Sequence, residues 1–147
     1  MFQNVLTELR QFAGRLPSSV LMVGKVSPEQ RAGALEELCA WCQRDAYHPQ
    51  RMAFKLPNVS TSIIVVIDEV ADMSRDDQQT LLQWLEHQRD TMVLSFAINP
   101  IFSLVTQGRF LDRLYYRLNV MTLNVNDDVA WPIPRAVTKK QFIGPAR

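Results

Sequence analysis

Apolar residues along the chain follow two spacings, one typical of helices and one typical of buried strands. Apolar positions three or four residues apart predict helices with one face toward a core, whereas short continuous apolar runs between turn residues predict buried strands. We therefore expect helices over 2–13, 28–44, 75–89 and 101–118, the last broken near Gly108. Strands are expected over 19–23, 52–56, 63–67, 92–97 and 120–125.

The beginnings of two of these helices are marked by capping residues. Ser27 is followed by Pro28, which suits the first helical turn, and Gln30 completes the pattern of a capping box. Ser74 is a good cap for the helix that follows it. The sequence therefore fixes where both helices start.

The clearest strand covers residues 63–67, where five branched aliphatic residues stand in a row. Such a run is buried on both faces, which is typical of a central strand in a parallel sheet covered by helices. Alternating strands and helices imply right-handed crossovers and a three-layer α/β fold. We expect one α/β domain over 1–126 and an extended or disordered tail over 127–147, where the periodicity stops.

The composition is ordinary for a globular domain, with 47% hydrophobic residues, 21% charged residues and a net charge of +1 over 147 residues. The net charge is therefore too small to indicate electrostatic binding to nucleic acid or to a membrane surface. Acidic residues are concentrated in 68–90, and none follows Asp128, although basic residues continue to the end. The sequence shows neither a leader pattern nor a long apolar run, so we expect a cytoplasmic location.

Cys39 and Cys42 lie three residues apart on an expected helix. Such a pair is found in redox sites and in halves of zinc sites, but neither a second cysteine pair nor a histidine cluster completes it here. Their neighbours include Leu35, Leu38 and Trp41, which favours small core residues as the interpretation.

Asp68 and Glu69 follow the central strand directly, at the edge where open α/β sheets bind ligands. In P-loop NTPases the first acid of such a pair holds magnesium and a following glutamate orients the attacking water. Acids are also common after any buried strand, because the chain returns to solvent there. The pair taken by itself therefore does not decide between these two interpretations.

Two longer segments carry a resemblance to a known family. The chain reads DEVADMS from Asp68, then QQTLLQWL from Gln78, and GRFLDRLYYRLNV from Gly108. These segments resemble the Walker B region and the GRFREDLYYRLNV segment of the sigma-54-dependent transcription activators, which are AAA+ enhancer-binding ATPases of the NtrC type. The resemblance covers roughly residues 5–125 and implies a P-loop NTPase or AAA+-like parallel sheet.

The same resemblance assigns roles to individual residues. It implies that Asp68 and Glu69 are the Walker B acids, with Asp68 as the metal ligand if a metal binds. Asn99, at the end of SFAIN, corresponds to the sensor I residue, although a plain turn with Pro100 explains it as well. Arg117 matches one of the family's paired arginines that act on a neighbouring subunit; Leu111 stands at the other position, with Arg113 close by.

The Walker A loop departs from the family pattern. Such a loop needs glycines that let backbone N–H groups wrap the phosphates, a lysine, and a Ser or Thr for magnesium. Gly24 enters the loop, but Gln30 and Arg31 stand where the lysine and the Ser or Thr belong. Of the nucleotide-binding residues, only a degenerate set remains, formed by Gly24, Lys25 and Ser27. We therefore expect that the protein binds no cofactor; the alternative is that it binds ATP and magnesium.

Other family parts are absent from the sequence. Nothing between Lys25 and the Walker B strand resembles the GAFTGA loop that contacts the sigma factor, and about 20 residues after Val125 are too few for the helical lid. A helix-turn-helix pattern is also missing, so sequence-specific DNA binding is not indicated. We expect a monomer or dimer that binds a protein partner, such as a complete AAA+ activator or another regulatory assembly.

These observations are compatible with three functions. The first is a non-catalytic AAA+-like regulatory or interaction module, and the second is a nucleotide-binding transcription regulator with weak or partner-dependent ATPase activity. The third is a receiver-like domain with Asp68 as phosphoacceptor. A receiver needs acids after its first strand, where this chain has Val23, Gly24 and Lys25. The first function accounts best for the retained and missing motifs.

Overall fold

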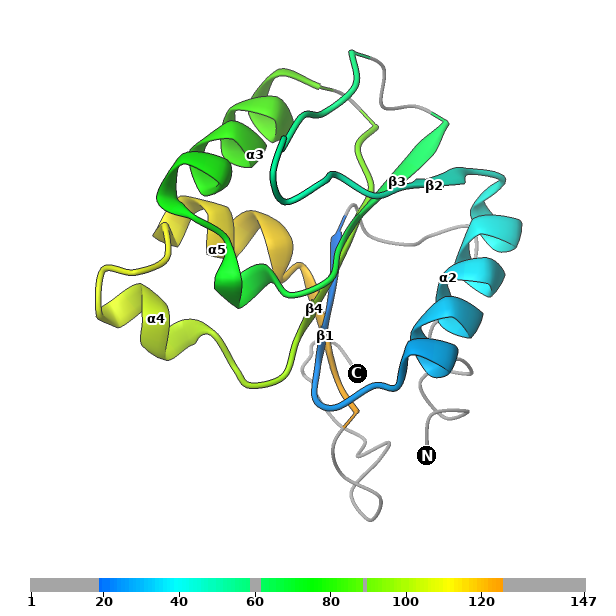
Figure 1. Cartoon of the computed structure of the whole chain (residues 1–147), viewed down its shortest axis with the longest axis horizontal. Coiled ribbons are helices and arrows are strands. Elements are labelled where there is room, and N and C mark those ends of the chain that lie inside the picture. The colour runs from blue at the N-terminus through cyan, green and yellow to red at the C-terminus, as the bar shows by residue number, and fades with distance from the viewer. Residues whose placement is uncertain (1–18, 59–61, 89, 126–147) are drawn as a thin grey trace.

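The computed structural model describes residues 19–58, 62–88 and 90–125. A parallel sheet with the strand order β2-β3-β4-β1-β5 forms its centre (Figure 1). The strands are β1 (Ser19–Val23), β2 (Asp45–Tyr47), β3 (Ile63–Ile67), β4 (Val93–Ala97) and β5 (Met121–Asn124). This arrangement confirms the predicted α/β fold.

The helices cover both faces of the sheet. They are α2 (Pro28–Cys42), the short 3-10 helix η1 (Val70–Asp72), α3 (Arg75–His87), α4 (Phe102–Thr106) and α5 (Asp112–Leu118). Figure 1 shows α2 on one side of the sheet and α3, α4 and α5 on the other. Two apolar cores result, one between the sheet and α2 and one between the sheet and α3 and α5.

Both predicted helix caps are confirmed. The Ser27 hydroxyl accepts a hydrogen bond from the Gln30 N–H at 3.1 Å, and the Gln30 side chain accepts one from the Ser27 N–H at 3.1 Å. Ser74 caps α3 by accepting from the Asp77 N–H at 3.1 Å. The region predicted as a broken helix over 101–118 is two helices, α4 and α5, separated at Gly108, whose φ is +74°.

The strand predicted over 52–56 is wrong. The edge strand is β2, which pairs with the first three residues of β3, whereas 52–56 belongs to an irregular segment. β2 ends at Tyr47 because Pro49 follows shortly after and has no N–H to continue a ladder. The apolar residues that suggested a strand, Phe54 and Leu56, pack instead against the α3 core.

Three predictions concern residues outside the described ranges and stay predictions. They are the helix over 2–13, the extended or disordered tail over 127–147, and the expectation that the residues after Val125 form no helical lid. Among the described helices, none is long and apolar enough to cross a membrane. Cys39 and Cys42 are free thiols packed at the edge of the α2 core, and burial raises the pKa of each. Their packing agrees with the core interpretation.

Candidate functional site

The predicted site residues gather at the carboxyl edge of the parallel sheet. Gly24 follows β1, Asp68 and Glu69 follow β3, and Asn99 lies two residues after β4. Because β3, β4 and β1 are consecutive in the sheet, these strand ends are neighbours. The connections from β1 and β4 leave toward opposite faces, so this edge is the topological switch point where open α/β sheets bind ligands.

Gly24 continues the sheet for one residue beyond β1. Its N–H donates to the Ala97 carbonyl at 2.8 Å, and its φ of +135° is a conformation that side chains rarely adopt. The glycine therefore turns the chain sharply out of the sheet toward α2. Lys25 and Ser27 follow on the exposed connection, and Asn99 is exposed in the turn before Pro100.

The amino terminus of α2 is closed by its own side chains. A phosphate bound in a P-loop uses the free backbone N–H groups at this place. Here the Gln30 N–H is bonded by Ser27, the Ser27 N–H is bonded by Gln30, and Pro28 has no N–H to offer. An anion at this helix start would have to displace the capping box.

Arg31 supplies a positive charge to Asp68 from α2. Its Nη1 lies 3.5 Å from Asp68 Oδ1, and its guanidinium carbon stands 4.7 Å from the centre of the Phe96 ring. Its buried Nε has no hydrogen-bond partner among the described residues. The guanidinium thus occupies the side of Asp68 that faces α2, where an inorganic cation would have to replace it.

Glu69 is half buried beside this pair. Burial raises the pKa of its carboxyl, and the nearby Asp72 charge raises it further. Hydrogen bonds with the backbone of Ile98 and Ala71, and the Arg31 charge, act in the opposite direction. Glu69 therefore lies close to the backbone that follows β4, in a partly desolvated position.

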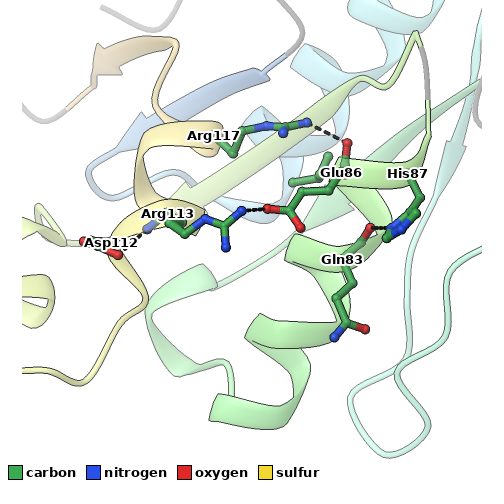
Figure 2. A network of polar contacts seen from close by, with 7 residues as sticks. Gln83, Glu86, His87, Asp112, Arg113 and Arg117 are labelled. Atoms are coloured by element: carbon green, nitrogen blue, oxygen red, sulfur yellow. Dashed lines mark hydrogen bonds and ion pairs between the residues drawn. The ribbon is translucent and has the colours of Figure 1, made fainter.

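Arg117, which the resemblance matched to a trans-acting arginine, and the nearby Arg113 both contact their own chain (Figure 2). Arg117 donates through Nη2 to the Leu85 carbonyl at 2.6 Å, and Arg113 forms an ion pair with Glu86. Both acceptors lie in the last turn of α3. These contacts hold α5 against α3. Tyr116, which lies between the two arginines in the sequence, is 63% exposed.

Gln78 connects the same two regions inside the protein. Its side chain is 1% exposed, donates to the carbonyls of Met73 (3.1 Å) and Arg109 (3.2 Å), and accepts from the Leu111 N–H (2.9 Å). The QQTLLQWL and GRFLDRLYYRLNV segments are therefore one interlocked unit. Leu114 and Leu118 of this unit are buried in the α3 core, and Tyr115 packs against it.

A cavity of about 260 Å³ lies next to the acidic pair, on the side of the segment that follows β2. Its lining is partly apolar and partly acidic: His48, Pro49, Arg51, Phe54, Val66, Ile67, Asp68, Glu69, Asp72, Met73, Ser74 and Asp77. Gly24, Lys25 and Ser27 are not part of it. Asp68 and Glu69 thus lie at the carboxyl edge of the sheet and also line this cavity.

The family described as the Sigma-54 interaction domain matches residues 34–127, more than half of the chain. The chain belongs to this family. The matched region contains β3 with its acidic pair, α3 and the α5 segment, the same parts that carried the resemblance in the sequence. The AAA+-type identity expected from those motifs is confirmed.

Relatives in the curated proteins are transcription regulators. The HTH-type transcriptional regulatory protein TyrR of Enterobacter agglomerans is 28% identical over 129 residues, which cover 80% of this chain and 24% of TyrR. TyrR of Salmonella typhimurium is 36% identical over 73 residues, which cover 42% of this chain and 14% of TyrR. The chain thus spans a quarter or less of the relatives that it matches.

Solved structures share the fold. NtrX from Brucella abortus in complex with ATP has a TM-score of 0.63 at 17% identity, over 85% of this chain and 35% of NtrX. The P-loop NTPase domain of a sigma-54 activator from E. coli has a TM-score of 0.55 at 12% identity, over 80% of this chain and 93% of that domain. At these identities the similarity establishes the P-loop NTPase architecture.

Two residues of the site were not assigned by sequence reasoning. In the sequence, Arg31 stands out only as a mismatch to the Walker A pattern. Gln78 was part of a matched motif, but nothing in its sequence context showed that an amide there would be buried and bonded three times. Both assignments depend on contacts between elements distant in sequence.

Proposed function

We propose that this domain is a non-catalytic regulatory or protein-interaction module related to the sigma-54-dependent transcription regulators. The observation that carries the proposal is the Arg31–Asp68 ion pair, at 3.5 Å, because the residue that would hold magnesium already has a cation attached to the protein. The capping box of α2 supports it, since the amides that would bind phosphate are already bonded.

The arginine contacts support the same proposal. An arginine that stabilises a neighbour's nucleotide must extend away from its own subunit, whereas Arg117 and Arg113 bond to the last turn of α3. They act here as positioning residues for α5. The domain keeps the contacts that shape the fold and lacks those that serve nucleotide chemistry.

Nucleotide titration of the full chain by calorimetry, with magnesium present, tests this proposal. We expect a dissociation constant weaker than about 1 mM for ATP and ADP, since neither phosphate nor metal finds a prepared partner. Micromolar binding that disappears in Lys25→Ala and persists in Lys55→Ala would establish the alternative, a nucleotide-binding regulator. Lys55 is a suitable control because it lies on the exposed segment after β2.

The proposal extends to partners and location. The chain works as a monomer or dimer in the cytoplasm, with a protein partner such as a complete AAA+ activator or another regulatory assembly, and with no bound cofactor. Its relationship to regulators in which it spans a small fraction of the length is consistent with a part that acts on or within a larger assembly.

A further inference from the structure

The large apolar and aromatic side chains that the described residues expose are concentrated between β4 and β5. Four of the five lie there, namely Ile98, Phe102, Tyr116 and Val120. The fifth, Met52, lies in the segment after β2. A single exposed apolar residue is ordinary on a protein surface, whereas several in one region mark a binding surface.

The aromatic side chains of α4 and α5 form a continuous row. The centre of the Phe102 ring lies 5.6 Å from that of Tyr115, and the centre of the Tyr115 ring lies 5.2 Å from that of Tyr116. Both distances are typical of favourable tilted and edge-to-face ring pairs. Tyr115 packs against the α3 core and so anchors the two more exposed rings. The row is therefore ordered in the free protein, and covering it costs little side-chain entropy.

The charge on this part of the surface is basic. Residues 98–120 contain Arg109, Arg113 and Arg117 and a single acid, Asp112. The Asp112 carboxylate accepts a hydrogen bond from the Arg113 N–H at 2.7 Å, at the start of α5. Arg113 lies three residues before Tyr116, a spacing that makes two side chains neighbours on a helix surface. We call this surface the α4–α5 face and define it by Phe102, Arg109, Arg113, Tyr115 and Tyr116.

The α4–α5 face already binds one carboxylate of its own chain. Arg113 pairs with Glu86 of α3, yet 70% of the Arg113 side chain stays exposed, so its guanidinium is accessible to a second carboxylate (Figure 2). Arg109 is exposed between α4 and α5, and no hydrogen bond or ion pair among the described residues holds its guanidinium. Two guanidinium groups beside an apolar row suit a ligand in which carboxylates accompany apolar side chains.

A nucleic acid fits this face less well. Its phosphates have to be neutralised by several cations at once. Arg117 is bonded to the Leu85 carbonyl, and Arg113 is shared with Glu86. Arg109 is therefore the one unshared guanidinium that the described residues of the face provide, which is too few for a polyanion.

A second copy of the chain also fits the face less well. The acids of this chain are most concentrated in residues 68–77, where Asp68 is already paired with Arg31 and Asp72 with Arg51. None of the large exposed apolar residues of the described chain lies in that segment. A second copy would therefore bring acids without the apolar side chains needed to cover the aromatic row.

We infer that the α4–α5 face binds an acidic amphipathic helix of a protein partner. The aromatic row receives the apolar side chains of that helix, and Arg109 and Arg113 bind carboxylates beside them. An amphipathic helix carries both kinds of group in this arrangement, an apolar stripe with charged residues next to it. The inference rests on the proposed function, because it names the surface and the chemistry by which an interaction module recognises its partner.

Titration of the ¹⁵N-labelled full chain with a synthetic peptide tests the inference. The probe is an alanine-based helix of about 18 residues, with leucine along one face and glutamate on both sides of it. The control peptide has lysine in place of each glutamate. We expect the glutamate peptide to shift the amide signals of α4 and α5 with a dissociation constant of about 10–200 μM, and the lysine peptide to bind at least about tenfold more weakly.

Three results of this titration would overturn the inference. The first is equal binding of the two peptides, because the charge of the face would then select nothing. The second is a set of shifts centred on α2, which lies on the other side of the sheet. The third is no shift with the glutamate peptide up to about 2 mM.

Single substitutions with matched controls locate the surface. Tyr116→Ala should weaken binding of the glutamate peptide about five- to twentyfold, since it removes an exposed ring of the row. Arg109→Gln should weaken it about two- to fivefold, the effect of one exposed charge contact. Met52→Ala and Lys55→Gln remove an exposed apolar side chain and an exposed charge after β2, and both should leave binding unchanged. Equal losses in the controls would contradict a specific face.

Further measurements separate this occupant from others. Self-association of the chain that disappears in Tyr116→Ala, measured by sedimentation, would show that a second copy covers the face and would overturn the inference. A single-stranded oligothymidine that binds there as tightly as the glutamate peptide would do the same. Micromolar ATP binding together with peptide binding would contradict only the non-catalytic part of the proposed function, whereas absence of both would overturn this inference alone.

Discussion

At the residue scale, two polar side chains, Arg31 and Gln78, join elements that are distant in the sequence. Arg31 gives Asp68 a counter-ion through an ion pair in which both side chains are partly exposed, so its contribution to stability is modest. The guanidinium also lies over the Phe96 ring, 4.7 Å from its centre, a second contact that holds it in place. Gln78 is the opposite case, a fully buried amide with each of its contacts directed to the backbone.

Gln78→Ala should lower the free energy of unfolding by about 2–4 kcal/mol, because it removes a buried side chain together with its three part-buried hydrogen bonds to the backbone of Met73, Arg109 and Leu111. Urea denaturation of the full chain measures this change. Gln79→Ala, the exposed neighbour on the same helix, should stay within about 0.5 kcal/mol of the wild type. A similar small effect for Gln78→Ala would show that the buried network contributes little.

At the element scale, α5 depends on α3. With seven residues, α5 is too short to be stable as an isolated helix, so its position follows from its contacts. Those contacts are the apolar face formed by Leu114 and Leu118 and the polar contacts at the end of α3. The carbonyl of Leu85 is in the last turn of α3, where an arginine also interacts favourably with the helix dipole.

Arg117→Ala should therefore cost about 1–2 kcal/mol in unfolding free energy, since it removes a charged hydrogen bond to a partly buried carbonyl. Arg113→Ala should cost less than about 1 kcal/mol, because its pair with Glu86 is exposed on the arginine side. Chemical denaturation of both variants decides the order. A larger loss for Arg113→Ala would mean that the ion pair, rather than the helix-end contact, positions α5.

The elements that the sequence predicted well are those with a strong local pattern. β3 has five consecutive branched aliphatics, and the starts of α2 and α3 have capping residues that act within one turn. β2 has only three residues, and they are mostly exposed, so its sequence shows none of the apolar pattern that predicts a strand. β2 is a strand because it pairs with β3. The same reason explains why the Arg31 contact with Asp68 was not predicted, since it joins α2 to β3 in space.

At the scale of the whole molecule, one sheet serves two cores. Alternate residues of β1, β3 and β4 point into the α2 core and into the α3 core, so each of these strands is shared. Damage to either core must therefore weaken the sheet on which the other core is built. The two faces are expected to unfold together.

Leu38→Ala in the α2 core and Leu81→Ala in the α3 core test this coupling. Each side chain is at most 1% exposed, so each substitution should cost about 2–5 kcal/mol. Both variants should keep a single unfolding transition with the denaturant dependence of the wild type. A separate early transition in either variant, seen by comparing fluorescence with circular dichroism, would show that the faces unfold independently.

The capping box of α2 has a consequence for evolution. A helix start that bonds its own amides is satisfied at all times, whereas an anion site is satisfied only when its ligand is present. Caps of this kind contribute about 1 kcal/mol, so a phosphate competing with Ser27 would bind roughly fivefold more weakly than at an uncapped helix. A substitution that freed these amides for an anion would also destabilise α2, so an anion site could evolve at this helix start only with a loss of stability.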